Sequence, residues 1–184
     1  MIEIYFEIVF LLITIIWLSL MLYRTVKNRH FNTINEIKLL SLYICLIVIA
    51  RITLFPYHLI DGHMQPLLFD KDRMVPFNKN LVPFVRMVHS YKSWKLNIIG
   101  NILMFIPVGI VWPLCFKKLD NIWKTVLAAA GYSFCIELIQ LMFFERCTDI
   151  DDLFLNTIGG LIGAVIYFGI KDVIRKKCSK DSKC

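Results

Sequence analysis

The stretch R-C-T-D-I-D-D-L-F-L-N-T-I-G-G-L-I-G, residues 146–163, opens a hydrophobic segment with polar and charged side chains where a membrane helix is normally apolar. On a helix that turns about 100° per residue, five of its residues lie within roughly 80° of one another. These are Asp149, Asp152, Asn156, Gly159 and Gly163. An ionisable residue in a membrane span costs free energy and therefore indicates a function. The two glycines allow another helix to approach this face closely.

The composition around this stretch is that of a membrane protein. The chain has 184 residues, a mean hydropathy of +0.64 and 58% hydrophobic residues, whereas a soluble domain is about half apolar. Several apolar runs approach or reach the length of about 20 residues that crosses a bilayer. The net charge of +7 lies between these runs and in the tail, so membrane topology and anionic lipid explain it better than nucleic acid does.

The sequence predicts an all-α integral membrane protein with five transmembrane helices. The predicted spans are residues 4–23, 39–55, 97–116, 122–144 and 152–170. We expect three regions: an N-terminal helix with a basic cytoplasmic loop (1–37), a four-helix membrane domain with an outer loop at 57–96 (38–170), and a basic cytoplasmic tail (171–184). Within the outer loop, residues 84–95 have the pattern of an interfacial amphipathic helix.

The positive charges predict the orientation. Of the 21 lysines and arginines, most lie in the first loop, in the turn after the third span and in the tail. Cytoplasmic loops carry such an excess. We therefore expect the N-terminus, the long loop and Arg146 outside, and the C-terminus in the cytoplasm.

The third and fourth spans carry polar residues of their own. Asn97 and Asn101 lie one turn apart near the start of the third span, which continues to Pro107 and Gly109. The proline should kink this helix, and the glycine should relieve the crowding. On the fourth span Ala130, Ser133, Glu137 and Gln140 share one face, which is small in the middle and polar near the end.

In the predicted topology, these polar residues of three helices lie at one depth near the outer face. We therefore expect a shared polar pocket about two turns deep and open to the outside. Its predicted members are Asn97, Asn101, Glu137, Gln140, Arg146, Asp149, Asp152 and Asn156. Arg51, near the end of the second span, has two interpretations: it snorkels to the head groups, or it is a counter-ion for these acids.

The chemistry of such a pocket is open at this point. Asparagine and glutamine side chains hydrogen-bond between membrane helices, and Asp149 or Asp152 could simply cap the fifth span. Glu137, Asp149 and Asp152 with amide oxygens are hard ligands that suit Mg²⁺ or Ca²⁺. The same three acids are the candidates for general acid–base catalysis. Alternatively, Arg146 and Arg51 neutralise the acids and leave a hydrogen-bonding cleft.

Four segments in order resemble the VanZ-like family. They are N-L-V-P-F at 80–84, N-I-I-G-N-I-L-M-F-I-P-V-G at 97–109, E-L-I-Q at 137–140 and the stretch at 146–163. The resemblance covers roughly residues 39–168. It carries over Asn97, Asn101, Pro107, Gly109, Glu137, Gln140, Arg146, Asp149, Asp152, Asn156 and Gly159, and the chain does not depart from the pattern at these positions.

The resemblance implies a small protein of the bacterial plasma membrane. The founding member of the family is associated with low-level resistance to teicoplanin, a lipid-tailed glycopeptide that binds peptidoglycan precursors outside the cell. Two functions fit the resemblance and the expected pocket. One is a non-enzymatic protein that binds the lipoglycopeptide antibiotic, a membrane lipid or a lipid-linked cell-wall precursor. The other is a divalent-ion-dependent membrane enzyme that acts on a phospholipid or polyprenyl-phosphate head group.

Overall fold

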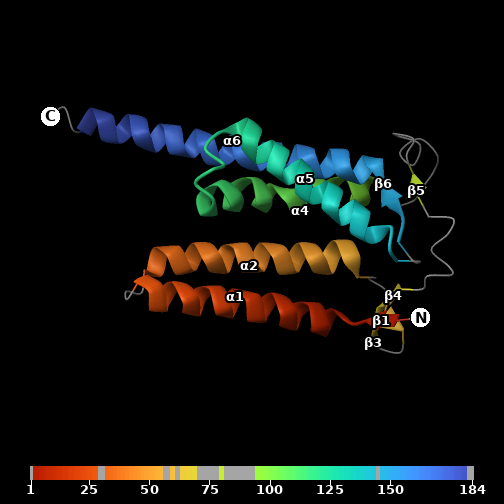
Figure 1. Ribbon diagram of the computed structural model, residues 1–184. Coiled ribbons are helices and arrows are strands. Elements are labelled where there is room, and N and C mark those ends of the chain that lie inside the picture. Colours follow the sequence, from red (N-terminus) through yellow and green to blue (C-terminus); the bar gives the residue numbers. More distant parts are fainter. Residues whose placement is uncertain are drawn as a thin grey trace. The chain divides into compact units, whose positions relative to one another are not determined.

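The computed structural model of the protein describes residues 2–28, 32–55, 59–60, 63–69, 79–80, 94–143 and 146–181 (Figure 1). Within these residues five helices are long and apolar enough to cross a membrane. They are α1 (Phe6–Asn28), α2 (Thr33–Leu54), α4 (Trp94–Cys115), α5 (Ile122–Gln140) and α6 (Ile150–Asp181). The predicted helical membrane class is confirmed. The predicted orientation and the three predicted regions stay predictions.

Several helix ends differ from the predicted spans. α2 begins at Thr33 rather than at 39, α5 ends at Gln140 rather than at 144, and α6 continues to Asp181 rather than ending at 170. Hydropathy marks the thickness of the bilayer, whereas helix ends depend on propensity and capping. Lysine, arginine and glutamate are good helix formers, so the basic residues after 170 prolong α6. At α2, the side chain of Asn32 accepts a hydrogen bond from the Asn35 amide and caps the helix.

The contacts divide the chain into two compact units. Unit 1 comprises residues 1–82 and 135–150, and unit 2 comprises residues 83–134 and 151–184. Each unit is described by itself below.

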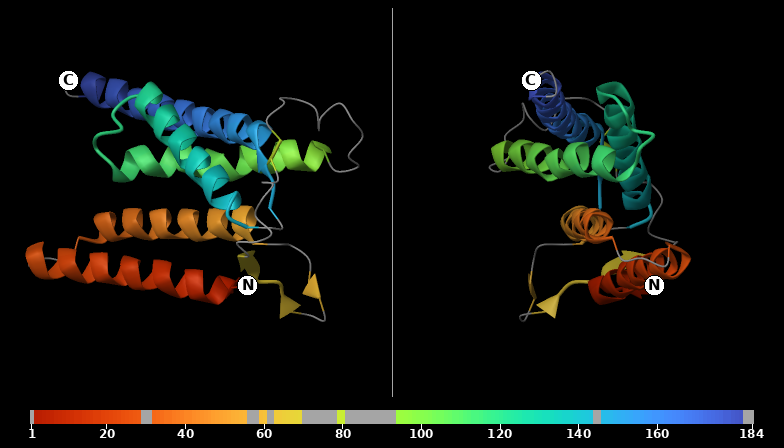
Figure 2. Two further views of the ribbon diagram at one scale, coloured as in Figure 1. Left: turned by 45° about the vertical axis from the view of Figure 1, so that its right-hand side comes forward. Right: turned by 90° about the vertical axis from the view of Figure 1, so that its left-hand side faces the viewer.

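Large side chains and hydroxyl groups hold α1 and α2 together in unit 1, where the two helices lie side by side (Figures 1 and 2). The Trp17 and Tyr43 rings lie 4.9 Å apart between centroids, and the Tyr43 hydroxyl is 2.9 Å from that of Thr14. Beyond the helix ends, Phe55, Leu67 and Phe143 form a small buried core. This core gives unit 1 a hydrophobic centre outside its two long helices.

Short strands join the ends of these helices to the connecting segments. β1 (Ile2–Ile4) pairs antiparallel with β4 (Leu67–Phe69), and β2 (Leu59–Ile60) with β3 (His63–Met64). β5 (Lys79–Asn80) pairs in parallel with β6 (Thr148–Asp149), so that Asn80 lies opposite Asp149. The amphipathic helix predicted at 84–95 lies outside the described residues except for its last two positions, where α4 begins.

Unit 2 is a bundle of α4, α6 and most of α5 (Figure 2), in which backbones touch through glycine. A Cβ on Gly159 would overlap the carbonyl of Ile102, and one on Gly163 would overlap that of Ile106. A Cβ on Gly109 would in turn meet the backbone of α6 at 160–164. The pairing 102 with 159 and 106 with 163 makes α4 and α6 parallel. Gly159 and Gly163 thus contact α4, and Gly109 belongs to the same seam.

The prolines of α4 bear on one of the sequence predictions. Pro107 and Pro113 both lie inside α4, which is continuous through them. The kink predicted at Pro107 stays a prediction.

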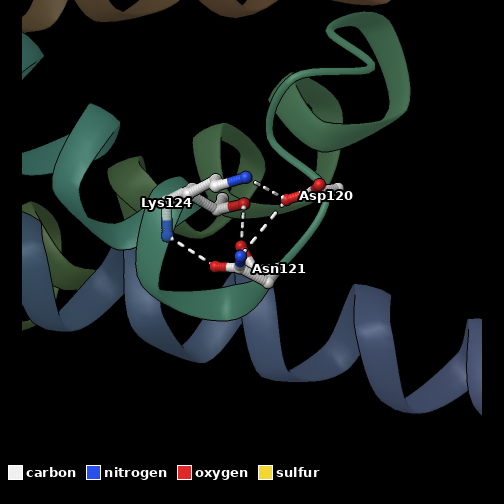
Figure 3. Close-up of polar contacts among 4 residues, drawn as sticks. Asp120, Asn121 and Lys124 are labelled. Carbon is white, nitrogen blue, oxygen red and sulfur yellow. Dashed lines mark hydrogen bonds and ion pairs between the residues drawn. The ribbon is translucent and has the colours of Figure 1, made fainter.

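The turn between α4 and α5 is fixed by a cap (Figure 3). The Asn121 side chain accepts a 2.9 Å hydrogen bond from the Lys124 amide, and Lys124 Nζ lies 2.8 Å from Asp120 Oδ1. The hydrogen bond from Lys124 Nζ to Asp120 is the main cause that holds the pKa of the Asp120 carboxyl below its ordinary value.

Candidate functional site

Asp152 and two asparagines form a polar cluster at one end of unit 2, called here the Asp152 cluster. Asp152 Oδ1 accepts a 2.6 Å hydrogen bond from Asn101 Nδ2 and a 3.1 Å bond from Asn97 Nδ2. Asn97 is exposed, and Asn101 and Asp152 are half-buried. The carboxylate is therefore held by two amides at a place that can be reached from the surface of the unit.

The fold of unit 2 explains why these three residues meet. Asn97 and Asn101 are one turn apart in α4, so they share a face of that helix. α6 runs parallel to α4 in glycine contact, which brings its first turn beside the first turns of α4. The N-terminus of a helix also favours negative charge. The structure brings these three predicted residues together.

A second polar pair lies one turn further along α6. Asn156 is 1% exposed and donates a 2.8 Å hydrogen bond from Nδ2 to the hydroxyl of Ser133, which is fully buried. Asn156, a predicted pocket residue, is thus deeply buried within unit 2. Its bond to Ser133 joins α5 to α6, which is the structural role that the sequence left open for the amides.

Glu137 and Asp149 form the centre of a cluster in unit 1, called here the Glu137 cluster. The Asp149 amide donates a 2.9 Å hydrogen bond to Glu137 Oε2, and the Thr148 hydroxyl donates to the Glu137 carbonyl at 2.8 Å. Asn80 Nδ2 lies 3.1 Å from Asp149 Oδ1 across the β5–β6 pair. Glu137 and Asp149 are only 4% and 2% exposed. Both buried acids are thus engaged in hydrogen bonds that order the segment before α6.

Gln140 and Arg146 have a more evident structural role. Gln140 Nε2 donates a 2.8 Å hydrogen bond to the Thr53 carbonyl, and Arg146 Nε donates a 2.7 Å bond to that of Leu54. These carbonyls belong to the last turn of α2, where backbone acceptors have no partner within the helix. A cation is also favourable at this end of the helix dipole. The two side chains therefore cap α2 in unit 1.

Arg51 lies in the last turn of α2. Its Nη1 lies 3.3 Å from the Phe55 carbonyl, and its guanidinium carbon lies 5.7 Å from the centre of the Phe6 ring. These contacts involve the end of α2 and an aromatic face. The role of counter-ion to the acids stays a prediction.

The predicted members thus fall into distinct groups: Asn97, Asn101, Asp152 and Asn156 in unit 2, and Glu137, Gln140, Arg146 and Asp149 in unit 1. Whether they form one shared pocket stays a prediction. Within the part of the chain that the structure describes, no three His, Cys, Asp or Glu side chains are arranged to hold a metal ion. The Mg²⁺ or Ca²⁺ site on Glu137, Asp149 and Asp152 likewise gains no support from the described residues.

The structure adds Asn80 and Asp151 to the polar residues of interest. In the sequence, Asn80 stands out only as part of the family segment at 80–84. Its hydrogen bond to Asp149 joins residues that are 69 positions apart. No local periodicity predicts such a contact. Asp151 is 3% exposed, and on the helical wheel it lies about 100° from Asp152. Its place beside Asp149 and Asp152 at the start of an apolar run is the sequence signal that could have found it.

Comparisons with known proteins agree with these motifs. A family model described as VanZ/LLP1 matches residues 8–174, a wider range than the 39–168 expected from the motifs. Protein VanZ of Enterococcus faecium is 34% identical over 88 residues, which is 48% of this chain and 51% of that protein. The chain therefore spans about half the length of this curated relative. No solved structure matches. The chain belongs to the VanZ/LLP1 family and is a multi-pass bacterial membrane protein.

Proposed function

We propose that this protein lowers susceptibility to teicoplanin-type, lipid-tailed glycopeptides by binding the antibiotic or an envelope lipid at an outward-facing polar site. The Asp152 cluster is the centre of that site. The proposal extends the resistance associated with the family's founding member to this chain. It assigns binding rather than catalysis.

The observation that carries the proposal is the pairing of Asp152 with Asn97 and Asn101 at a place that a ligand can reach. Each asparagine amide has two N–H donors and one carbonyl acceptor, and its bond to Asp152 uses one donor. A hydroxyl or amide group of a ligand can therefore be recognised by hydrogen bonds beside the carboxylate. Among the described residues, Asn97 and Asn101 donate to a carboxylate, whereas Gln140 and Arg146 donate to carbonyls at the end of α2.

The site must face outward for this function, and the charge distribution supports that orientation. Residues 24–38, the α4–α5 turn and the residues from 171 onward carry 13 of the 21 lysines and arginines, the excess that is typical of the cytoplasmic side. A cysteine introduced near Asp61 should react with an impermeant thiol reagent in intact cells, and one near Ser182 should not, in a background without the native cysteines. The reverse labelling would place the Asp152 cluster inside and end the proposal.

The central test is a teicoplanin-susceptibility assay in a sensitive host. Asp152→Asn keeps the shape of the side chain but removes its charge, and Asp149→Asn does the same in the Glu137 cluster. Asn caps a helix about as well as Asp, so a purely structural role predicts little loss. We expect both variants to lose the resistance that the unmodified chain confers. Asp120→Asn on the α4–α5 turn is the matched control and should keep it.

Two further measurements separate the outcomes. Expression level and melting temperature of each variant show whether a lost phenotype is lost folding. Labelled teicoplanin and a labelled glycopeptide without the lipid tail are then titrated against the purified chain in nanodiscs. Weaker binding of the tailed compound by Asp152→Asn supports the proposal. Full resistance in both pocket variants leaves the acids as scaffolding, and Asp149-dependent turnover of a phospholipid with Mg²⁺ favours the enzyme instead.

A further inference from the structure

α6 is longer than a membrane span requires. Its 32 residues extend about 48 Å at 1.5 Å per residue, whereas the hydrocarbon core of a bilayer is about 30 Å thick. The glycine contacts with α4 end near Ala164, and residues 171–179 are all exposed. The last part of α6 therefore lies beyond the packed bundle of unit 2.

The place where α6 leaves the bundle has the composition of a membrane interface. Lys171 Nζ lies 5.9 Å from the centre of the Tyr167 ring and 5.6 Å from that of Phe168. One turn later, Arg175 is exposed as well. Aromatic rings followed by cations are typical of the head-group region.

The α4–α5 turn contributes to the same surface of unit 2. Lys171 is one of the cations that lower the pKa of the Asp120 carboxyl, after the hydrogen bond from Lys124, so α6 lies close to this turn. Figure 3 shows the ribbon of α6 passing beside the turn. Lys117 and Lys118 are exposed there. Trp123 is 79% exposed and Phe116 is 45% exposed.

We propose that this surface, called here the basic end, binds the phosphate groups of anionic phospholipids. Its cations are Lys117, Lys118, Lys124, Lys171 and Arg175. They outnumber the two nearby carboxylates, Asp120 and Asp172, so the surface is complementary to an anionic head group. The inference is separate from the proposed outward-facing site, because it concerns the opposite ends of α4 and α6.

The exposed aromatic residues favour a lipid over a soluble anion. Trp123 lies directly before Lys124, and Phe116 directly before Lys117. Such rings insert at the boundary of head groups and acyl chains, while the neighbouring lysines reach phosphate. A nucleic acid or an acidic protein would leave these rings in water.

The helix supplies a matched pair of variants for the test. Lys171 and Arg175 are one turn apart and share one side of α6, and Lys171 acts on Asp120 of the α4–α5 turn. Lys176 and Lys177 are turned from Lys171 by about 140° and 240°, at 100° per residue. Two double variants remove the same charge from this exposed segment. One combines Lys171→Gln with Arg175→Gln, and the other combines Lys176→Gln with Lys177→Gln.

The full-length chain is purified in detergent and mixed with phosphatidylglycerol and phosphatidylcholine in equal amounts. Native mass spectrometry then measures the ratio of the two bound lipids. We expect the unmodified chain to prefer phosphatidylglycerol. In the Lys171/Arg175 variant the ratio of bound phosphatidylglycerol to phosphatidylcholine should fall about fivefold for each charge removed. The Lys176/Lys177 variant should keep most of the preference. Inorganic phosphate at millimolar concentration should not compete.

Three outcomes overturn the proposal. The first is that the unmodified chain shows no preference for the anionic lipid. The second is that both double variants lose the preference equally, which would indicate diffuse attraction to any charge on α6. Competition by phosphate indicates an anion site without lipid selectivity. A melting curve of each variant, recorded without added lipid, verifies that the bundle is intact. None of these outcomes depends on resistance to an antibiotic.

Discussion

The α1–α2 pair of unit 1 is more hydrophobic than the bundle of unit 2, and the helices of the two units pack by different means. The most apolar 18-residue stretches of α1 and α2 have mean hydropathies of 2.3 and 2.2, and 0% and 17% of their residues are buried. The corresponding stretches of α4, α5 and α6 have mean hydropathies of 2.1, 1.4 and 1.9, and 28%, 28% and 39% of their residues are buried. Hydropathy therefore accounts for insertion into the membrane and not for helix association.

The difference follows from small residues and polar groups. α1 and α2 contain no glycine, and their contacts are made by rings and hydroxyls such as those of Trp17, Tyr43 and Thr14. α4 and α6 touch backbone to backbone at Gly159 and Gly163. Since lipid tails are as apolar as leucine, close packing and hydrogen bonds drive helices together in a membrane. The less hydrophobic bundle is accordingly the better buried one.

The strongest way to break this comparison is to fill the glycine seam. In Gly163→Leu the new side chain meets the Ile106 carbonyl and Gly109 Cα, which cannot move without separating the helices. We expect a loss of about 3 kcal/mol, at the upper end of overpacking costs, and a melting temperature lower by roughly 6 to 12 °C. Gly169→Leu is the control on the same helix, because nothing lies within 4 Å of a Cβ there. Equal melting of both variants contradicts the seam.

The Asp152 cluster gives the next largest effect and separates its two amides. Asn101 is half-buried and holds Asp152 at 2.6 Å, whereas Asn97 is exposed and lies 3.1 Å away. Asn101→Leu should therefore cost about 1.5 kcal/mol of unfolding free energy, typical of a lost hydrogen bond to a charged group. Asn97→Leu should cost clearly less. The measurement is denaturant unfolding in detergent, and the reverse order would show that the shorter bond is not the stronger one.

These contacts show how far a sequence predicts such a fold. The spans and the glycine face of α6 follow from periodicity, because helix geometry fixes which residues share a face. The grouping of Asn97, Asn101 and Asp152 follows from the predicted topology, which places the starts of both helices at one depth. The capping of α2 by Gln140 and Arg146 does not follow, since it joins residues 87 and 92 positions apart. The same holds for Asn80 and Asp149. The length of α6 was underestimated because charge ends a membrane span but not a helix.

A smaller effect is expected in the glycine-free pair of unit 1. Tyr43→Phe removes the hydroxyl that lies 2.9 Å from that of Thr14 but keeps the ring against Trp17. Hydrogen bonds between membrane helices contribute about 0.6 kcal/mol on average. We expect a loss of that size in a thermal or denaturant unfolding experiment. Tyr43→Ala also removes the ring contact and should cost more. If Tyr43→Phe costs as much as Tyr43→Ala, the polar pair dominates and the contrast with unit 2 is smaller than we infer.

The smallest effect concerns the α4–α5 turn, where solvent screens every charge. The pKa of Asp120 is lowered chiefly by its hydrogen bond from Lys124 and to a lesser extent by the charge of Lys171. Since the lowered pKa belongs to the folded state, the stabilisation is present above the ordinary aspartate pKa. It is lost as the pH falls through the lowered value. Carbon-13 NMR of labelled aspartate in micelles measures this titration directly.

Lys124→Gln should return the Asp120 pKa most of the way to its ordinary value, and Lys171→Gln should raise it less, because Lys171 acts only through its charge. The difference in stability should be near the limit of detection, since exposed ion pairs contribute little. An unchanged Asp120 pKa in Lys124→Gln would mean that the lysine side chain spends its time in solvent. The turn would then be held by the Asn121 cap alone, and the end of unit 2 would be built like the rest of the bundle, from hydrogen bonds to backbone and close packing rather than from charge.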